Sequence, residues 1–387
     1  MRSTSSAISA YETAGYSSSS SRWNPANWTR RIWLAVGTVV VLIVVVVVGA
    51  VVGVKATRDN GDGGNSIYPD YFKLNYTLID TYSGTTFFDK FNYFHTWDPA
   101  GGFVHYVDPD YAATFNLTWA TSSTALIRVD TTVGPGSQPD ASTGRFSVRL
   151  ESKAQYGPGL FLFDVKHTPY GCATWPALWL TDPNNWPHNG EIDVLEAVNQ
   201  ATTGGLAALH TAPDCTMADV RRNMTGKAEH AACDDALSGS NTGCVVRGGA
   251  AAYGPEFNKA GGGIVALEWR DEGIRVWVFP RGRGGGDTTT PAAGLTALPD
   301  IEADETPDPS TWGPPLADFP ATGCDIASHF RNQSIIINID LCGYLTEAMW
   351  EESGCSHLTC PEFVANNPSA FTNAYWEFGA FQVYKAK

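Results

Sequence analysis

Three acidic residues stand close together in an otherwise apolar stretch, residues 189–199, which reads NGEIDVLEAVN. They are Glu191, Asp193 and Glu196, so their spacing is two residues and then three. Because side chains alternate between the two faces of a regular strand, Glu191 and Asp193 would share one face and Glu196 would point to the other. A β-bulge at Val194, Leu195 or a neighbour would return Glu196 to the shared face, and bulges are common beside active sites. We therefore predict a bulge in this strand.

The chemistry that such a bulge would permit is acid–base catalysis on a glycosidic bond. Two carboxyl groups about 5–5.5 Å apart form the pair used in retaining glycoside hydrolysis, in which one attacks the anomeric carbon and the other protonates the leaving oxygen. Asp193, between the two glutamates, would then hydrogen-bond the nucleophile and titrate with them as a coupled unit. A solvated strand face with no function would also tolerate Glu191 and Asp193. The preceding Trp175, Trp179 and Trp186 favour a sugar-binding cleft instead.

The composition excludes one large class of partner. The chain has 387 residues, of which 43% are hydrophobic and 17% charged, and its formal net charge is −15. A nucleic-acid partner needs a basic surface, so we expect none. The 13 Trp, 15 Tyr and 18 Phe suit neutral ligands such as sugars, because aromatic rings stack on the apolar faces of pyranoses.

One segment, residues 32–54, has the sequence of a transmembrane helix. It reads IWLAVGTVVVLIVVVVVGAVVGV and contains no charge. At 1.5 Å per residue it would span about 34 Å, enough for a hydrocarbon core of roughly 30 Å. A secretory signal peptide has a shorter apolar region close to a basic start, whereas here a polar tail comes first. Arg30 and Arg31 at the N-terminal end favour a cytosolic N-terminus, and so a single-pass type II protein with an extracellular or lumenal C-terminal part.

The cysteines and glycosylation sequons agree with that orientation. All eight cysteines follow the apolar segment, an even number suited to disulfides in an oxidising compartment, although reduced core thiols remain the alternative. The cysteines are Cys172, Cys215, Cys233, Cys244, Cys324, Cys342, Cys355 and Cys360. The sequons on the same side of the segment are at Asn75, Asn116, Asn223 and Asn332. We therefore expect a disulfide-bonded glycoprotein.

The remaining sequence divides into a tail, a linker and one large domain. Residues 1–31 form a Ser-rich cytosolic tail that we expect to be disordered, and 55–67 a short flexible linker. Residues 68–387 lack a second linker and show alternating strand patterns between Gly/Pro-rich turns, without long helical periodicity, which predicts an all-β sandwich or jelly roll. The predicted strand segments are 145–152, 159–165, a hairpin over 263–280, 334–341 and 375–385. Residues 281–322, rich in Gly, Pro, Thr and Asp, are expected to form a long surface loop.

The acidic stretch and its surroundings resemble a known enzyme family. NGEIDVLE resembles the E-[IL]-D-x-x-E signature of glycoside hydrolase family 16 in its bulged form. The longer GCATWPALWLTDPNNWPHNGEIDVLEAVN, and also GRFSVRLESKAQYGPGLFLFDVKHTPYGC, ALHTAPDC, GGGIVALEWRDEGIRVWVFPR and IIINIDLCG, look like fungal endo-β-1,3(4)-glucanases of the laminarinase type. The resemblance covers most of residues 85–385.

The resemblance implies a fold and a set of roles. The fold would be a β-jelly-roll sandwich of two curved antiparallel sheets, with the cleft along the concave sheet. Glu191 matches the nucleophile, Asp193 the assisting acid and Glu196 the general acid/base. Substrate-binding positions are expected at Trp175, Trp186, His210 and, in the 263–280 hairpin, Trp269. Trp277 is assigned to the core, and Trp179 suits core or cleft equally.

The resulting expectation is a retaining endo-β-glucanase that hydrolyses β-1,3-glucan and mixed β-1,3/1,4-glucan. A cell-wall transglycosylase that uses the same site is the alternative, and a glucan-binding module on an inactive scaffold is a third reading, which the complete set of acids disfavours. The expected partners are a β-glucan polysaccharide and a lipid bilayer through residues 32–54, and we expect a monomer. Neither a cofactor nor a metal site is predicted, because the Cys and His residues lack zinc spacing and we find no dedicated acidic loop for calcium.

Overall fold

The computed structural model describes residues 68–137, 143–234, 242–282 and 307–387. The predicted tail (1–31), membrane helix (32–54) and linker (55–67) lie outside the described residues. Within the described ranges, no helix is both long enough and apolar enough to cross a bilayer.

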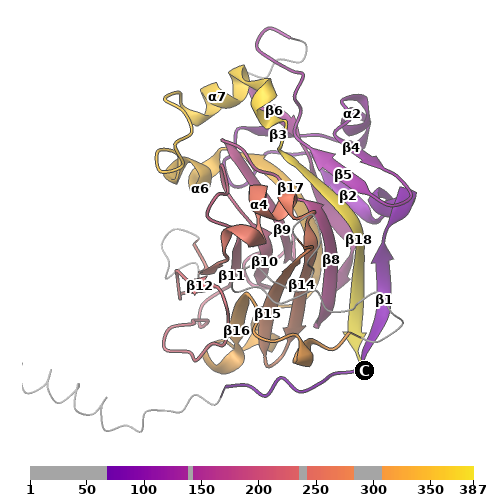
Figure 1. The fold of residues 1–387 in the computed structure, drawn as a ribbon, viewed down its shortest axis with the longest axis vertical. Coiled ribbons are helices and arrows are strands. Elements are labelled where there is room, and N and C mark those ends of the chain that lie inside the picture. The colour runs from indigo at the N-terminus through magenta and orange to yellow at the C-terminus, as the bar shows by residue number, and fades with distance from the viewer. Residues whose placement is uncertain (1–67, 138–142, 235–241, 283–306) are drawn as a thin grey trace, which may run out of the picture. The chain divides into compact units, whose positions relative to one another are not determined.

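Two antiparallel sheets of eight strands each make up the fold (Figure 1). Sheet A runs in the order β16-β15-β14-β8-β18-β5-β4, with β1 also paired to β18, and sheet B runs β12-β13-β11-β10-β9-β17-β7-β2. The strands of sheet A are β1 Tyr76–Tyr82, β4 Thr118–Ala120, β5 Ala125–Arg128, β8 Gly159–His167, β14 Gly263–Arg270, β15 Gly273–Pro280, β16 Ala317–Pro320 and β18 Tyr375–Ala386. Those of sheet B are β2 Phe91–Phe94, β7 Arg149–Tyr156, β9 Thr174–Thr181, β10 Glu191–Glu196, β11 Leu206–His210, β12 Lys227–Ala228, β13 Cys244–Arg247 and β17 Gln333–Leu341.

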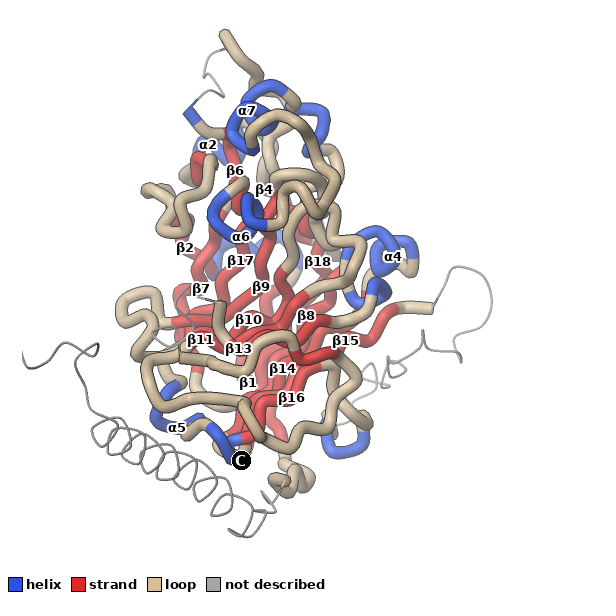
Figure 2. Tube along the Cα trace, turned by 90° about the vertical axis from the view of Figure 1, so that its left-hand side faces the viewer, coloured by secondary structure: helices blue, strands red, loops and turns tan. Residues whose placement is uncertain are grey.

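Short elements complete the described chain. β3 Val104–Tyr106 and β6 Arg145–Ser147 form a small parallel pair. The α-helices are α2 Pro109–Thr114, α4 Gly254–Lys259, α5 Ile326–His329, α6 Gly343–Ala348 and α7 Cys360–Asn366. The 3-10 helices are η2 Gly84–Lys90, η4 Ala250–Ala252, η5 Pro309–Thr311, η6 Ala321–Gly323 and η7 Pro368–Phe371. In Figure 2, α6 and α7 lie towards one end of the strands and α5 towards the other.

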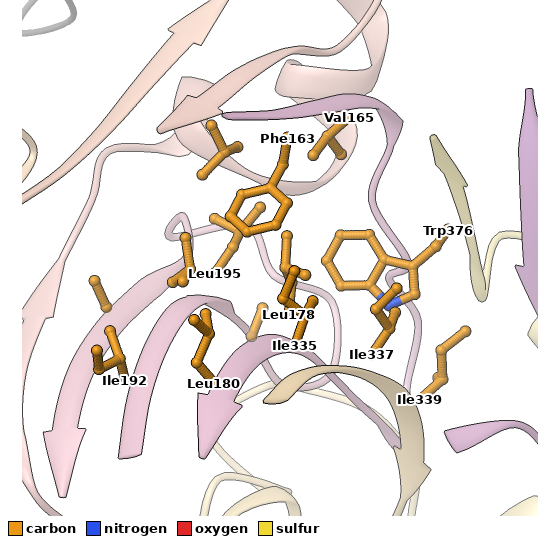
Figure 3. Packing of buried hydrophobic residues seen from close by; sticks show 14 of the residues in the cluster. Phe163, Val165, Leu178, Leu180, Ile192, Leu195, Ile335, Ile337, Ile339 and Trp376 are labelled. Carbon is orange, nitrogen blue, oxygen red and sulfur yellow. The ribbon is translucent and has the colours of Figure 1, made fainter. Parts of the chain in front are cut away.

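The core lies between the two sheets and follows from the alternation of apolar residues. Leu178 and Leu180 on β9, Ile192 and Leu195 on β10, and Ile335, Ile337 and Ile339 on β17 point from sheet B towards Phe163, Val165 and Trp376 of sheet A (Figure 3). All ten residues are at most 2% exposed. The side chains between them along each strand therefore face away from the core, and in sheet B that face carries the acids. The predicted all-β sandwich and each predicted strand segment are confirmed.

The expected loop over residues 281–322 is partly wrong. Within its described part, Ala317–Pro320 forms strand β16, which pairs antiparallel with β15 and extends sheet A. Four residues are too few to show a periodic pattern, so the pairing with β15 determines this strand rather than its own composition. Residues 283–306 of the predicted loop lie outside the described residues.

The cysteines are all paired, as the even number predicts. The four disulfides join Cys172 to Cys355, Cys215 to Cys324, Cys233 to Cys244 and Cys342 to Cys360. Two of them hold the segment that contains α6 and the turn after it. The Cys172–Cys355 disulfide joins this segment to the start of β9, and the Cys342–Cys360 disulfide joins it to α7. That segment borders the site described next.

Candidate active site

The predicted β-bulge lies at Val194. On the β9 side, Asp193 pairs with Trp179 and Leu195 pairs with Leu178, so Val194 is the extra residue between two consecutive partners. On the β11 side, the register also shifts between Asp193 and Glu196. A bulge places two residues opposite one, and this restores the alternation beyond it.

The bulge brings the three acids to one face. Their partners on β9 are Thr181, Trp179 and Ala177, which alternate along that strand and share its side away from the core. Ile192, Val194 and Leu195 are at most 2% exposed and belong to the core. Asp193 is 3% exposed, whereas Glu191 and Glu196 are half-buried. The predicted distance of about 5–5.5 Å between the two glutamates stays a prediction.

Each glutamate accepts a hydrogen bond from a tryptophan. The Trp186 indole N–H donates to Oε2 of Glu191 at 2.5 Å, and the Trp175 indole N–H donates to Oε1 of Glu196 at 2.6 Å. Trp186 is 42% exposed, so its ring also offers a surface to solvent, whereas Trp175 is 8% exposed. These two N–H donors orient the carboxyl groups of the glutamates, and each donor stabilises the ionised form of the carboxyl group that it contacts.

His210 lies beside the acids on the neighbouring strand, as the sequence predicts. It pairs with Glu191 in the β10–β11 register, and its Nε2 lies 3.2 Å from Oδ2 of Asp193. That oxygen is buried, and no hydrogen bond of good geometry reaches it from the described residues. Ligand atoms of Glu191, Asp193 and His210 all lie within 4.8 Å of one another, which among the described residues is the group that a metal ion would fit. The expectation that no metal binds remains untested.

The environment of the site raises the pKa of both glutamates, so that one of them can hold a proton while the other is ionised. Burial of the carboxyl raises the pKa of Glu191, and the nearby charges of Asp193 and Glu196 raise it further, against the opposing effects of His210 and Trp186. Burial and Asp193 likewise raise the pKa of Glu196, against the Trp175 hydrogen bond. Three acids in such proximity share their protons as one coupled unit. A general acid can therefore stay protonated near neutral pH, which general acid catalysis requires.

The prediction for Trp269 is wrong. It lies on β14 in sheet A, is 1% exposed and belongs to the core between the sheets, so it cannot contact a sugar. Trp277, on the neighbouring β15, is 1% exposed as predicted and packs edge-on against Trp312 on the other face of sheet A.

Trp179, Asn338 and Arg149 lie on the same face of sheet B as the acids, and the last two were not predicted. Trp179, which the sequence left open, pairs with Asp193 and donates its indole N–H to Oδ1 of Asn338 at 2.7 Å. The Arg149 guanidinium lies over the Trp179 ring, 5.0 Å from its centroid. The alternation in residues 145–152 already places Arg149 on the side away from the core. Its neighbours could not be foreseen, because they depend on the strand order.

A family model for an XgeA-like, catalytic GH16 domain matches residues 91–384. The chain belongs to glycoside hydrolase family 16. It is 40% identical over 321 residues to a probable glycosidase of Schizosaccharomyces pombe, covering 82% of this chain and 71% of that protein. It is also 40% identical over 319 residues to an endo-1,3(4)-beta-glucanase of Arthroderma benhamiae, covering 80% of this chain and 65% of that one.

Solved structures of family 16 proteins agree with the fold. Laminarinase 16A from Phanerochaete chrysosporium, determined with 6-O-glucosyl-laminaritriose in its donor and acceptor sites, is 39% identical, with a TM-score of 0.72. An elongating family 16 beta-1,3-glucosyltransferase is 34% identical, with a TM-score of 0.69. Each match covers 80% of this chain and 100% of the solved chain.

Proposed function

We propose that this protein is a retaining endo-β-glucanase that cleaves β-1,3-glucan and mixed β-1,3/1,4-glucan. The observation that carries the proposal is the bulge at Val194, because it places Glu191, Asp193 and Glu196 together on the face of sheet B that points away from the core. The similarity to named endo-1,3(4)-beta-glucanases supports the choice of substrate.

The proposed roles divide a difficult displacement into two steps. The ionised Glu191 carboxylate attacks the anomeric carbon while the protonated Glu196 gives its proton to the departing glycosidic oxygen. Glu196, now ionised, then takes a proton from water as that water displaces Glu191, so the configuration of the sugar is retained. Burial and the charge of Asp193 support the first step by keeping a proton on Glu196, and the Trp175 N–H stabilises the carboxylate that remains.

Asp193 and His210 have a supporting role in this proposal. Asp193 lies between the glutamates in the chain, and its negative charge raises the pKa of both. The His210 imidazole, whose Nε2 lies 3.2 Å from Oδ2 of Asp193, opposes that effect, because a positive charge there lowers the pKa of both glutamates. Trp186, with its half-exposed ring and its hydrogen bond to Glu191, is the proposed sugar platform beside the nucleophile.

A glucan transglycosylase is the second candidate function. The elongating beta-1,3-glucosyltransferase has the same fold at 34% identity, and transfer differs from hydrolysis only in the molecule that attacks the covalent intermediate. Both candidates use the same acids, so the acceptor decides between them.

The test is product analysis with two polysaccharides. The purified full-length protein is incubated with laminarin and, separately, with mixed-linkage β-glucan, and the products are sized by chromatography. We expect rapid shortening to oligosaccharides. Products longer than the starting glucan would favour transfer, and no change in either glucan would refute the proposed activity.

We further propose that residues 32–54 anchor the protein in a membrane as a single-pass type II protein, with the catalytic part outside the cytosol and acting on cell-wall glucan as a monomer. The uncharged segment and the flanking Arg30 and Arg31 support the anchor. The four disulfides support an oxidising compartment, and the four sequon asparagines Asn75, Asn116, Asn223 and Asn332 are all exposed. Protease added outside sealed membranes should spare the first 30 residues; loss of that tail would overturn the orientation.

A further inference from the structure

One side chain of the site, Trp175, depends for its orientation on residues outside the site. Trp175 and Ala177 are two residues apart on β9, and Ala177 pairs with Glu196, so the tryptophan lies on the same face of sheet B as the acid. Its position on that face does not decide where the indole N–H points, because two side-chain torsions separate the ring from the backbone. The N–H reaches Glu196 at 2.6 Å only in one orientation of the ring, and contacts around the ring must select it.

The first two residues of α6 pack against the Trp175 ring. The Tyr344 ring meets the indole edge-on, with the ring centroids 4.9 Å apart and an angle of 86° between the planes. This edge-to-face contact is a preferred arrangement of aromatic rings. Gly343 lies against the same ring, since a Cβ at this position would come within 3.0 Å of Cζ3 of Trp175. The indole therefore has no room to tilt towards Gly343, and Tyr344 supports it from α6.

Covalent and backbone bonds hold the start of α6 in place. Cys342, the residue before α6, forms a disulfide with Cys360, and its backbone N–H donates to the Ala173 carbonyl at 2.8 Å. Ala173 directly precedes β9, the strand that carries the indole. The Cys172–Cys355 disulfide joins the turn after α6 to the same strand end. The ring and its support are therefore fixed to one part of the fold.

The hydrogen bond from Trp175 matters most while Glu196 is ionised, because an N–H donor binds a carboxylate more strongly than a carboxylic acid. In the first step proposed above, the proton moves from Glu196 to the glycosidic oxygen as the bond from that oxygen to the anomeric carbon breaks and Glu191 bonds to the carbon. Negative charge develops on Glu196, and an N–H that is already aimed at it stabilises this charge without reorganisation. Burial and Asp193 raise the pKa of Glu196, and the Trp175 hydrogen bond opposes them.

We propose that Tyr344 is a positioning residue of the reaction, whose ring, together with Gly343, holds the Trp175 N–H on Glu196 and so supports proton transfer by that acid. The inference rests on the proposed function, because it takes Glu196 as the general acid/base. Tyr344 is 48% exposed, so the experiment has to separate this role from a direct contact with the sugar.

The experiment compares how kcat/KM on laminarin depends on pH in a small set of variants. Tyr344→Ala removes the supporting ring, Tyr344→Phe keeps it, and Trp175→Phe keeps an aromatic ring at the site but removes the N–H. Tyr111→Ala is the matched control, since Tyr111 on α2 is 50% exposed and also packs on an aromatic ring, that of Phe115. Circular dichroism shows that each variant is folded.

The expected readout is the alkaline limb of the pH profile. Without the N–H, Glu196 keeps its proton to a higher pH, so the limb should move up by about one pH unit in Trp175→Phe and by about half a unit in Tyr344→Ala. Tyr344→Phe and Tyr111→Ala should keep the wild-type profile. The double variant should show the limb of Trp175→Phe alone, because both changes act on one hydrogen bond.

A second substrate separates proton transfer from sugar binding. 2,4-Dinitrophenyl β-laminaribioside releases a weakly basic phenolate that needs no proton. In Tyr344→Ala its kcat/KM should therefore stay within about twofold of the wild-type value, whereas kcat/KM on laminarin at the pH optimum should fall about tenfold.

The proposal is overturned if the alkaline limb of Tyr344→Ala stays at the wild-type pH, or if the two substrates lose the same factor. Slower laminarin hydrolysis with an unmoved limb would instead assign the Tyr344 ring to the sugar. Failure of the proposed function would look different, because the wild type would then cleave neither substrate.

Discussion

Both sheets contain buried acidic residues, but the negative charge of these residues is balanced differently in the two sheets. In sheet A, Glu268 on β14 is 1% exposed and faces Arg275 across the β14–β15 pair, where Nε of Arg275 donates to it at 3.0 Å. The Tyr76 hydroxyl donates to its other oxygen at 2.7 Å, and Arg270 lies 3.8 Å away. In sheet B, Glu191, Asp193 and Glu196 stand together with one histidine and two indole N–H donors, and in the described part of the chain no arginine is among their hydrogen-bond partners.

The difference separates an acid that supports the fold from acids that do chemistry. A buried carboxylate matched by arginines holds two strands together, and removing one partner leaves the other charge uncompensated. Burial without such partners, together with the charge of Asp193, raises the pKa of Glu191 and Glu196, so these groups hold protons to a higher pH than an ordinary glutamate. Groups that gain and lose protons near neutral pH are the ones that acid–base catalysis needs.

The largest expected effect of this contrast is on activity. Glu191→Gln keeps the shape and hydrogen bonding of the side chain but removes the nucleophile, so kcat/KM on laminarin should fall by about 10⁴-fold or more. The measurement is the initial rate of reducing-sugar release, with circular dichroism to show that the variant is folded. Glu377→Gln, on β18 of the other sheet, is the control and should keep wild-type activity. A Glu191→Gln variant with a substantial fraction of the wild-type rate would refute the role of Glu191.

The next effect is on stability and concerns the other sheet. Glu268→Gln leaves Arg275 and Arg270 buried without their carboxylate, which should cost about 3–5 kcal/mol of unfolding free energy. Urea unfolding with the disulfides intact measures it, and kcat at a temperature where the variant is folded should match the wild type. Lys73→Met, which breaks the exposed pair with Asp308, should cost less than about 1 kcal/mol. Equal costs for the two variants would show that burial of the Glu268 network contributes nothing.

The contrast also explains which parts of the site could be predicted from the sequence. In β10, Ile192 and Leu195 must both face the core, so the single extra residue between Asp193 and Leu195 has to be accommodated as a bulge. Apolar alternation on one side of a strand thus fixes where the acids on its other side point. The same alternation predicts the strands around it.

Sheet A offers no such information, and the error at Trp269 follows from that. Seven of the eight residues of β14 are buried, because Tyr76, Trp312 and other residues cover the outer face of the sheet while the core covers the inner one. Where both faces of a sheet are buried, the alternation of apolar residues does not distinguish them. The sequence of such a strand therefore does not show whether a tryptophan lies in the core or in a cleft. The strand order that brings Arg149 and Trp179 together is likewise a tertiary property that no local pattern contains.

A smaller effect links stability to pH and tests the protonated state of the cleft acids. Because the pKa of Glu191 is raised on folding, the native state loses stability as pH rises from the ordinary glutamate value towards the raised one. Gln cannot ionise, so Glu191→Gln should be more stable than the wild type by roughly 1–2 kcal/mol at pH 8 and about equal to it at pH 4. Urea unfolding of both proteins at the two pH values measures this. A difference that does not grow with pH would mean that Glu191 is not protonated by its surroundings.

The smallest expected effect is that of a chelator on activity. This experiment tests whether a bound metal ion, rather than a proton, balances the negative charge of the acids in sheet B. Glu191, Asp193 and His210 are close enough to hold a cation, but metal ligands must be deprotonated, and the raised pKa of Glu191 works against this. Dialysis against EDTA should therefore leave laminarin hydrolysis unchanged at pH 6. Added Zn²⁺ should inhibit more strongly as the pH rises, because it competes with the proton for Glu191. Loss of activity on chelation, with recovery on adding one particular metal, would show that a metal ion balances the charge of the acids in sheet B. The two sheets would then differ only in the source of the positive charge, which would be a bound metal ion in sheet B and arginine side chains in sheet A.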